Sequence, residues 1–321
     1  MYRIGIDLGG TNIAAGIIND KFEIITKTSV PTGAQRPAEE IVADMVAVCY
    51  TVCREAGIKP EEIASVGIAS PGIANHDKGI IEYCSSISSF VQFPICDAVR
   101  AGFPAKEVFV ENDANAAAWG EAIAGSAKGT RSSIMITLGT GVGGGIIIDG
   151  KVISGFNYAG AELGHIVIEV GGKPCGCGRK GCWEAYSSAT ALIRMTNEML
   201  EACAAEGRKT VMTELVAKSG KASGRTAFDA MRAGDAAGEE VVRRYVYYLA
   251  QGLTNIINIF QPEVLCIGGG ISGEGDYLLD LIVPLVRAEV YGHGIVKDTD
   301  IRIATLRNDA GIIGGAVLGL K

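Results

Sequence analysis

The stretch that decides the fold is Ile4–Lys21, IGIDLGGTNIAAGIINDK, which has a counterpart at Ile134–Lys151, IMITLGTGVGGGIIIDGK. The two copies align without gaps, and the apolar residues before the turn and the final lysine coincide. Each copy has an apolar run, a turn rich in glycine and threonine, and a second apolar run, which is the pattern of a β-hairpin. Glycine has no Cβ, so such turns can approach a ligand closely. The repeat predicts two similar lobes, each with one backbone N–H loop for the phosphates of a nucleotide.

The polar residues at the hairpin tips favour this interpretation over that of two ordinary hairpins. Asp7, Thr11 and Thr140 place there side chains of the types that bind Mg²⁺ or contact phosphate. A third glycine cluster, Gly268-Gly269-Gly270, follows an apolar strand and a helix with apolar residues between Val242 and Phe260. Bare backbone of this kind suits a flat adenine ring or a ribose.

The remaining elements alternate between strands and helices, which favours an α/β fold. Strands are expected at 3–8, 13–19, 23–28, 66–69 and 108–110, and helices at about 37–57, 113–124 and 309–320. The glycines and alanines of the last helix allow close packing, and we expect it to return to the first lobe.

The composition is that of a globular protein of two lobes in a reducing compartment. Hydrophobic residues make up 48% and charged residues 20% of 321 residues, which exceeds the usual size of a single core. The net charge of −7 comes with no basic stripe, so neither nucleic-acid nor membrane partners are expected. Without a signal sequence or an unbroken apolar span, we expect a cytoplasmic protein whose cysteines at 49, 53, 203 and 266 are reduced core residues.

Glu111-Asn112-Asp113 is the segment in which we expect the chemistry. It lies where a strand ends and an alanine-rich helix begins, the place where open α/β sheets put functional groups. Asp113 is suited to accept a proton from an attacking sugar hydroxyl, and the amide of Asn112 to hold neighbouring hydroxyls. The alternative is that these residues only cap the helix, since Asn and Asp are preferred N-caps.

His165 and three cysteines form the expected ligand set of a structural zinc ion. Cys175, Cys177 and Cys182 are spaced as a compact, glycine-rich knuckle, and one histidine with three thiolates is a normal tetrahedral set. A disulfide with a spare thiol is the competing interpretation. The metal is predicted to fix His165 and to place Glu162 and Glu184 beside a pocket for a polyhydroxylated molecule.

These segments together resemble the ROK family (repressor, open reading frame, kinase), most closely its bacterial glucokinase branch. The resemblance covers nearly the whole chain and is carried by Asp7-Leu8-Gly9-Gly10-Thr11, Glu111-Asn112-Asp113, Leu138-Gly139-Thr140-Gly141, Glu162-x-Gly164-His165, the knuckle with Glu184, and Gly268-Gly269-Gly270.

The resemblance implies a two-lobed, actin-like ATPase (ribonuclease H-like) fold with duplicated lobes and an active-site cleft between them. The expected lobes are residues 1–112, completed by a helix at about 308–321, and residues 113–307, which carry the zinc loop. The implied activity is an ATP-dependent hexose kinase of glycolysis, most closely a glucokinase, that uses Mg²⁺ and forms homodimers or homotetramers.

The resemblance also assigns roles to single residues. Asp113 would be the catalytic base. The sugar would be bound by Gly72, Asn112, Asp113, Glu162, His165 and Glu184. ATP and Mg²⁺ would be bound by Asp7, Gly9, Gly10, Thr11, Thr140, Gly141, Gly268, Gly269 and Gly270. Zinc would be held by His165, Cys175, Cys177 and Cys182.

Ser86 departs from the family pattern, because many sugar kinases of the family carry an asparagine there. A shorter side chain has less reach into the pocket, so the preferred sugar is open among glucose, N-acetylmannosamine, fructose, allose and mannose. A phosphate donor other than ATP is also open. A sugar-responsive repressor is disfavoured because the first strand starts by Arg3, which leaves no room for a preceding DNA-binding domain. A substrate-free actin-like ATPase is disfavoured by the zinc knuckle.

Overall fold

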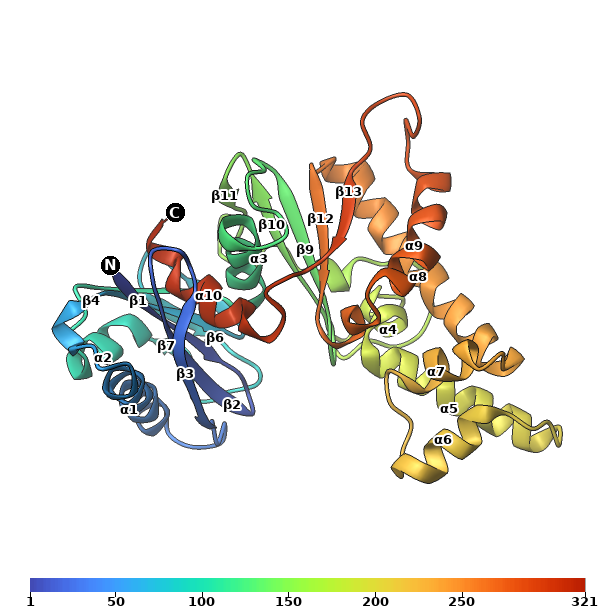
Figure 1. Ribbon diagram of the computed structural model, residues 1–321, viewed down its shortest axis with the longest axis horizontal. Coiled ribbons are helices and arrows are strands. Elements are labelled where there is room, and N and C mark those ends of the chain that lie inside the picture. The colour runs from blue at the N-terminus through green and yellow to red at the C-terminus, as the bar shows by residue number, and fades with distance from the viewer. Residues whose placement is uncertain (321) are drawn as a thin grey trace. The chain divides into compact units, whose positions relative to one another are not determined.

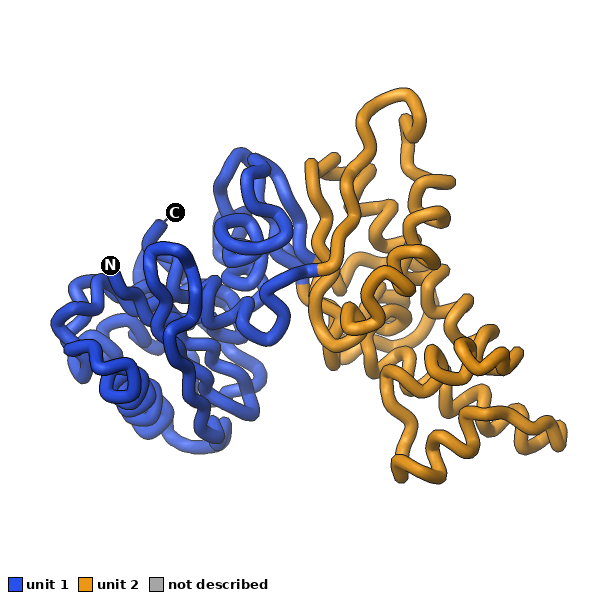
Figure 2. Tube along the Cα trace, viewed as in Figure 1, with its two compact units in different colours: residues 1–135, 144–161, 304–321 blue, residues 136–143, 162–303 orange. Residues whose placement is uncertain are grey.

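The computed structural model describes residues 1–320, which divide into two compact units (Figures 1 and 2). Unit 1 comprises residues 1–135, 144–161 and 304–321, and unit 2 comprises residues 136–143 and 162–303. This division differs from the predicted lobes, because residues 113–135 and 144–161 group with the N-terminal segment. The C-terminal segment also groups with it, as expected for the last helix.

Two five-stranded sheets share one strand order, which confirms the predicted duplication and the α/β class. The first is β3-β2-β1-β4-β8 and the second is β11-β10-β9-β12-β13. In the first, β1 is antiparallel to β2 and parallel to β4, and in the second β12 is parallel to β13. The repeated sequence accounts for the shared order, because it forms the first hairpin of each sheet, β1–β2 and β9–β10. A third, three-stranded sheet has the order β5-β6-β7.

The strands are β1 Tyr2–Leu8, β2 Asn12–Ile18, β3 Ile24–Pro31, β4 Ile63–Ser70, β5 Ile73–Asn75, β6 Ile80–Tyr83, β7 Val91–Phe93, β8 Glu107–Asn112, β9 Ser133–Leu138, β10 Val142–Ile148, β11 Lys151–Val152, β12 Val264–Gly268 and β13 Asp300–Ile303. The α-helices are α1 Ala38–Ala56, α2 Ile95–Gly102, α3 Asp113–Ala124, α4 Glu184–Ser187, α5 Ala189–Ala205, α6 Val211–Ser219, α7 Thr226–Arg232, α8 Ala236–Phe260, α9 Asp276–Glu289 and α10 Ala310–Ala316. The 3-10 helices are Pro60–Glu62, Leu163–His165, Gly270–Glu274, Arg307–Asp309 and Leu318–Leu320.

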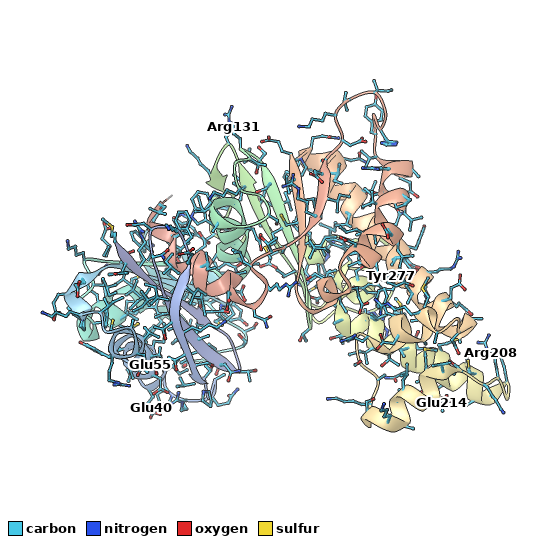
Figure 3. All side chains as sticks on the ribbon, in the orientation of Figure 1. Glu40, Glu55, Arg131, Arg208, Glu214 and Tyr277 are labelled. Carbon is cyan, nitrogen blue, oxygen red and sulfur yellow. The ribbon has the colours of Figure 1, made fainter. Side chains whose placement is uncertain are left out.

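Helix α1 covers one face of the first sheet. Its apolar residues Ile41, Met45, Val48 and Val52 recur at helical spacing, are all buried, and share a core with the isoleucines of β1. Its side chains Glu40 and Glu55 are exposed on the surface (Figure 3). The helix ends at the left-handed Gly57, as the predicted limits of 37–57 require.

Helix α10 covers the other face, where glycines allow it to approach unusually closely. Successive residues of a strand point to opposite faces, so Gly5 faces away from the α1 core to which Ile4 and Ile6 belong. A Cβ on Gly5 would lie 1.7 Å from the carbonyl oxygen of Ile312, and one on Gly67 would lie 1.9 Å from that of Gly315. Helix α10 also packs on α3, which holds it beside the junction of β8 and α3. It is shorter than the predicted 309–320, because a 3-10 turn follows.

Candidate functional site

The predicted site residues fall into two groups, one in each unit. Unit 1 holds Asp7, Gly9, Gly10, Thr11, Gly72, Asn112 and Asp113. Unit 2 holds Thr140, Gly141, Glu162, His165, Glu184, the three knuckle cysteines and Gly268 to Gly270.

In unit 1, two carboxylates lie at the ends of two parallel strands, β1 and β8, which are separated in the sheet by β4. Asp7 is near the end of β1, and Asp113 opens α3 directly after β8. Burial, and then the negative charge of Asp113, raise the pKa of Asp7 to about 6. Asp113 itself is exposed, and its Oδ1 accepts a hydrogen bond of 2.8 Å from the N–H of Ala114. One carboxylate is thus shielded and close to a second that faces solvent, as a cation site beside a base requires.

Asn112 is the N-cap of α3, as predicted by the alternative in which this segment caps the helix. Its Oδ1 accepts hydrogen bonds from the N–H groups of Ala114 and Asn115, and its Nδ2 donates to the carbonyl oxygen of Gly72 at 3.0 Å. Gly72 has a φ of +87°, and a Cβ there would lie 2.2 Å from the carbonyl oxygen of Tyr83. Gly72 therefore orients the amide of Asn112 through its own backbone. The predicted sugar-binding roles of Gly72 and Asn112 remain predictions.

In unit 2, the turn after β9 is held by Glu184. Oε2 of Glu184 accepts a hydrogen bond from the N–H of Val142 at 3.1 Å, and a Cβ on Gly141 would lie 2.3 Å from the same oxygen. Oε1 lies 3.4 Å from Sγ of Cys175. A single carboxylate therefore links the knuckle to the glycine turn Gly139–Gly141.

Two further predicted segments meet the same turn. A Cβ on Gly164 would lie 2.1 Å from the carbonyl oxygen of Val142, so the segment from Glu162 to His165 packs directly on it. Gly269 has a φ of +80°, and a Cβ there would lie 2.5 Å from the backbone of Leu138. The structure thus brings the third glycine cluster and the segment from Glu162 to His165 to the end of β9, and their predicted roles in binding nucleotide and sugar remain predictions.

The four residues of the knuckle lie close enough together to hold a metal ion. The ligand atoms of His165, Cys175, Cys177 and Cys182 lie within 4.8 Å of one another. Sγ of Cys175 is 3.6 Å from Nδ1 of His165, and Sγ of Cys177 is 3.6 Å from that of Cys182. Tetrahedral Zn–S bonds of about 2.3 Å place two sulfurs about 3.8 Å apart, so the donor set fits this metal. All nine cysteines are free thiols, which contradicts the disulfide alternative.

Local electrostatics distinguish the knuckle thiols. Hydrogen bonding to the backbone N–H of Arg179 lowers the pKa of Cys177 below its usual value. Burial raises the pKa of Cys175 to about 12.

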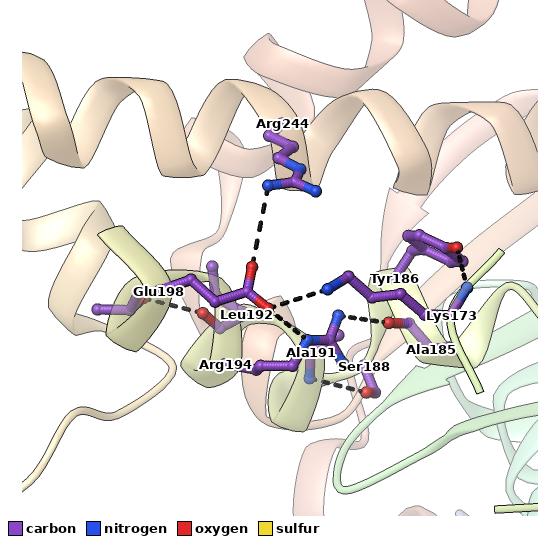
Figure 4. A network of polar contacts seen from close by, with 10 residues as sticks. Lys173, Ala185, Tyr186, Ser188, Ala191, Leu192, Arg194, Glu198 and Arg244 are labelled. Atoms are coloured by element: carbon purple, nitrogen blue, oxygen red, sulfur yellow. Dashed lines mark hydrogen bonds and ion pairs between the residues drawn. The ribbon is translucent and has the colours of Figure 1, made fainter. Parts of the chain in front are cut away.

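Figure 4 shows the polar contacts of Glu198 on α5 with Lys173, which precedes the knuckle, and with two arginines. Oε1 of Glu198 is 2.9 Å from Nζ of Lys173, two residues before Cys175, and Arg194 and Arg244 lie at 3.4 and 3.9 Å from the same carboxylate. Burial alone would raise the pKa of Glu198, but these three cations lower it below its usual value. The backbone N–H of Lys173 also donates to Oη of the buried Tyr186.

Two contacts were missed by sequence reasoning. Gly311, noted only as a small helix residue, lies against the carboxyl group of Asp7. His76, which stands alone in the sequence, lies 3.2 Å from the carboxylate of Glu111. No local pattern marks either contact, because the partners come from distant segments.

Among residues 1–320, no helix combines the length and apolarity that crossing a bilayer requires.

Comparison with known proteins gives one family. The family model named ROK family matches residues 3–321. A glucokinase from Halalkalibacterium halodurans is 36% identical over 319 residues, covering 99% of this chain and 94% of that protein. An N-acetylmannosamine kinase from Salmonella heidelberg is 29% identical over 99% of this chain and 98% of its own. The crystal structure of a ROK family glucokinase from Streptomyces griseus in complex with glucose and AMPPNP covers 99% of both chains, with 33% identity and a TM-score of 0.82. Because these matches run through every segment described above, the chain belongs to the ROK family.

Proposed function

We propose that the protein is an ATP-dependent hexose kinase that transfers the γ-phosphoryl group to glucose. The observation that supports this most is the pair of a shielded carboxylate, Asp7 on β1, and an exposed carboxylate, Asp113 at the start of α3. The glucokinase similarity at 36% identity, against 29% for the N-acetylmannosamine kinase, favours glucose. Other hexoses and N-acetylhexosamines are the alternatives.

Each polar group has a distinct role in this proposal. Asp113 accepts the proton of the attacking sugar hydroxyl, and Asn112, Gly72, Glu162, His165 and Glu184 orient the sugar. The glycine turns at Gly9–Thr11, Thr140–Gly141 and Gly268–Gly270 hold the nucleotide phosphates and ribose with backbone N–H groups. Asp7 holds Mg²⁺, which neutralises charge on the transferred phosphoryl group when it is bound.

The zinc ion is proposed to be structural, held by His165, Cys175, Cys177 and Cys182. Four protein ligands leave no open position for a substrate. The free thiols throughout the chain favour a reducing, cytoplasmic location. A homodimer or homotetramer is proposed from the family resemblance.

The test is ADP production from Mg·ATP across glucose, mannose, fructose, allose and the two N-acetylhexosamines. Turnover with glucose supports the proposal. Turnover only with another sugar keeps the kinase activity but replaces glucose as the proposed substrate, and turnover with none of the sugars contradicts the proposed kinase activity. Asp113→Asn should lower kcat by about 10²–10⁴-fold, the usual contribution of a general base, with sugar affinity largely kept. Asp149→Asn, at an exposed turn aspartate paired with Arg131, is the control.

A further inference from the structure

Glu111 is a buried carboxylate one residue before the proposed sugar-binding asparagine. Its side chain is 1% exposed, and a buried carboxylate is costly unless donors surround it. Oε1 accepts hydrogen bonds from the N–H of Asn112 at 3.0 Å and from Nδ2 of Asn115 at 3.2 Å. Glu111 therefore holds the first turn of α3, from which Asp113 projects.

His76 contacts the second oxygen of this carboxylate. Nδ1 of His76 lies 3.2 Å from Oε2 of Glu111, and the imidazole is 33% exposed. His76 belongs to the turn between β5 and β6, so this contact joins two separate segments of unit 1.

His76 is itself held in place by Tyr158 and Asp77. The rings of His76 and Tyr158 meet edge to face, with centroids 5.0 Å apart. The hydroxyl of Tyr158 donates to Oδ2 of Asp77 at 2.6 Å, and Nε2 of His76 lies 3.5 Å from Oδ1 of Asp77. The imidazole is therefore fixed on both sides, with Nδ1 directed at Glu111.

We propose that His76 is a positioning residue for phosphoryl transfer, acting through Glu111 on Asn112 and Asp113; this rests on the proposed kinase function. The turn that carries His76 follows Gly72, whose carbonyl oxygen holds Nδ2 of Asn112. Both links therefore end at the junction of β8 and α3, one on Asn112 and one on Glu111. Groups that orient a reacting hydroxyl must be held closely, because misplacement by about 1 Å costs up to about 100-fold in rate.

Two substitutions separate the contact between Nδ1 of His76 and Glu111 from ring packing against Tyr158. His76→Phe keeps a ring against Tyr158 but has no donor, whereas His76→Asn lacks the ring but keeps an N–H group near the position of Nδ1. We expect His76→Phe to lower kcat about 10-fold, with the KM for ATP and the melting temperature nearly unchanged. His76→Asn should return kcat to within about 3-fold of the wild-type value. A purely structural role predicts the opposite order, so a kcat for His76→Asn no higher than that of His76→Phe overturns the proposal, as does a normal kcat for His76→Phe.

Hydrogen exchange provides a readout that is independent of activity. The N–H of Asn112 is bonded to Glu111, so a peptide covering residues 111–116 should exchange several-fold faster in His76→Phe and normally in His76→Asn. A peptide from α1 is the internal control. If the wild-type protein phosphorylates no sugar, the proposed function fails, and the exchange of this peptide alone decides the inference. Unchanged exchange in His76→Phe overturns the link between His76 and the α3 turn.

Discussion

Gly311 lies directly against the carboxyl group of Asp7, although 303 residues separate them in the chain. A Cβ on Gly311 would be 2.4 Å from Cγ and 2.5 Å from Oδ2 of Asp7. Real Cβ atoms do not approach so closely, so any side chain at this position must displace the carboxylate. The tight contact of α10 with the first sheet therefore sets the orientation of the proposed Mg²⁺ ligand.

Gly311→Ala is expected to weaken Mg·ATP binding by about 10-fold or more while the protein remains folded. The displaced atoms form the end of one side chain, so the backbone of β1 need not move. Nucleotide titration and thermal melting measure the two effects. Gly314→Ala is the contrasting variant, because its Cβ would lie 2.0 Å from the carbonyl oxygen of Ala116 and would separate α10 from α3. It should lower the melting temperature more than Gly311→Ala does, and equal nucleotide affinity in Gly311→Ala and wild type would contradict the argument.

Asp7→Asn should stabilise the metal-free protein at pH 8. The folded-state pKa is about 6 against 3.8 for the free side chain, so raising the pH through this window ionises Asp7 at a cost to the folded state. Above pH 6 the full cost, on the order of 2–3 kcal/mol, is present, and below pH 3.8 it is absent.

Thermal melting of both proteins at pH 8 and pH 4, in the presence of a chelator, measures this difference. The variant should melt several degrees higher at pH 8 and at the same temperature as wild type at pH 4. It should also lose Mg·ATP binding, and wild-type binding should weaken as the pH falls below 6. A variant that melts lower than wild type at pH 8 would rule out the burial argument.

Metal removal should affect the sugar before the nucleotide. We expect about one zinc ion per chain in the purified protein, and stripping it should raise the KM for glucose more than the KM for ATP. The reason is that His165 is both a zinc ligand and part of the proposed sugar site, and that Glu184, also of that site, contacts the zinc ligand Cys175. Elemental analysis and kinetics on Cys175→Ser measure both effects. Cys203→Ala, a buried cysteine outside the knuckle, is the control, and full zinc content in Cys175→Ser would exclude the assigned ligand set.

The elements that the sequence predicts well are those with local signals. The apolar runs around glycine turns predict both hairpins, and Pro37 and Gly57 predict the limits of α1. The spacing of the histidine and the three cysteines predicts a cluster that the structure brings together. Such patterns depend on neighbours within a few residues. The shared strand order of the two sheets then follows from the repeat.

The features that could not be predicted depend on contacts between distant segments. The grouping of residues 113–135 with unit 1 reflects the packing of α3 on α10, which meet because small residues line both helices. His76 carries no neighbouring motif, and its partner Glu111 was recognised only as part of a segment. Asn112 caps α3, and its amide is also held by the carbonyl oxygen of Gly72, a residue 40 positions earlier in the chain, whereas its sugar-binding role stays a prediction.

Ser86 offers a test of sugar preference, since its side chain borders the first glycine turn. Its Cβ would lie 3.6 Å from a Cβ on Gly10, and its Oγ is 3.4 Å from Sγ of Cys84. Ser86 is exposed, so a longer side chain can be accommodated there without repacking the core. Ser86→Asn should add one hydrogen bond to a sugar hydroxyl and lower the KM for glucose about 2- to 10-fold, since a single hydrogen bond contributes about 0.5–1.5 kcal/mol. Its kcat should change little, because the added contact forms equally in the ground and transition states.

The matched control is Ser88→Asn, at an exposed position in the same loop, which should leave the KM for glucose unchanged. If both variants shift the KM alike, the effect belongs to the loop as a whole and Ser86 does not select the sugar.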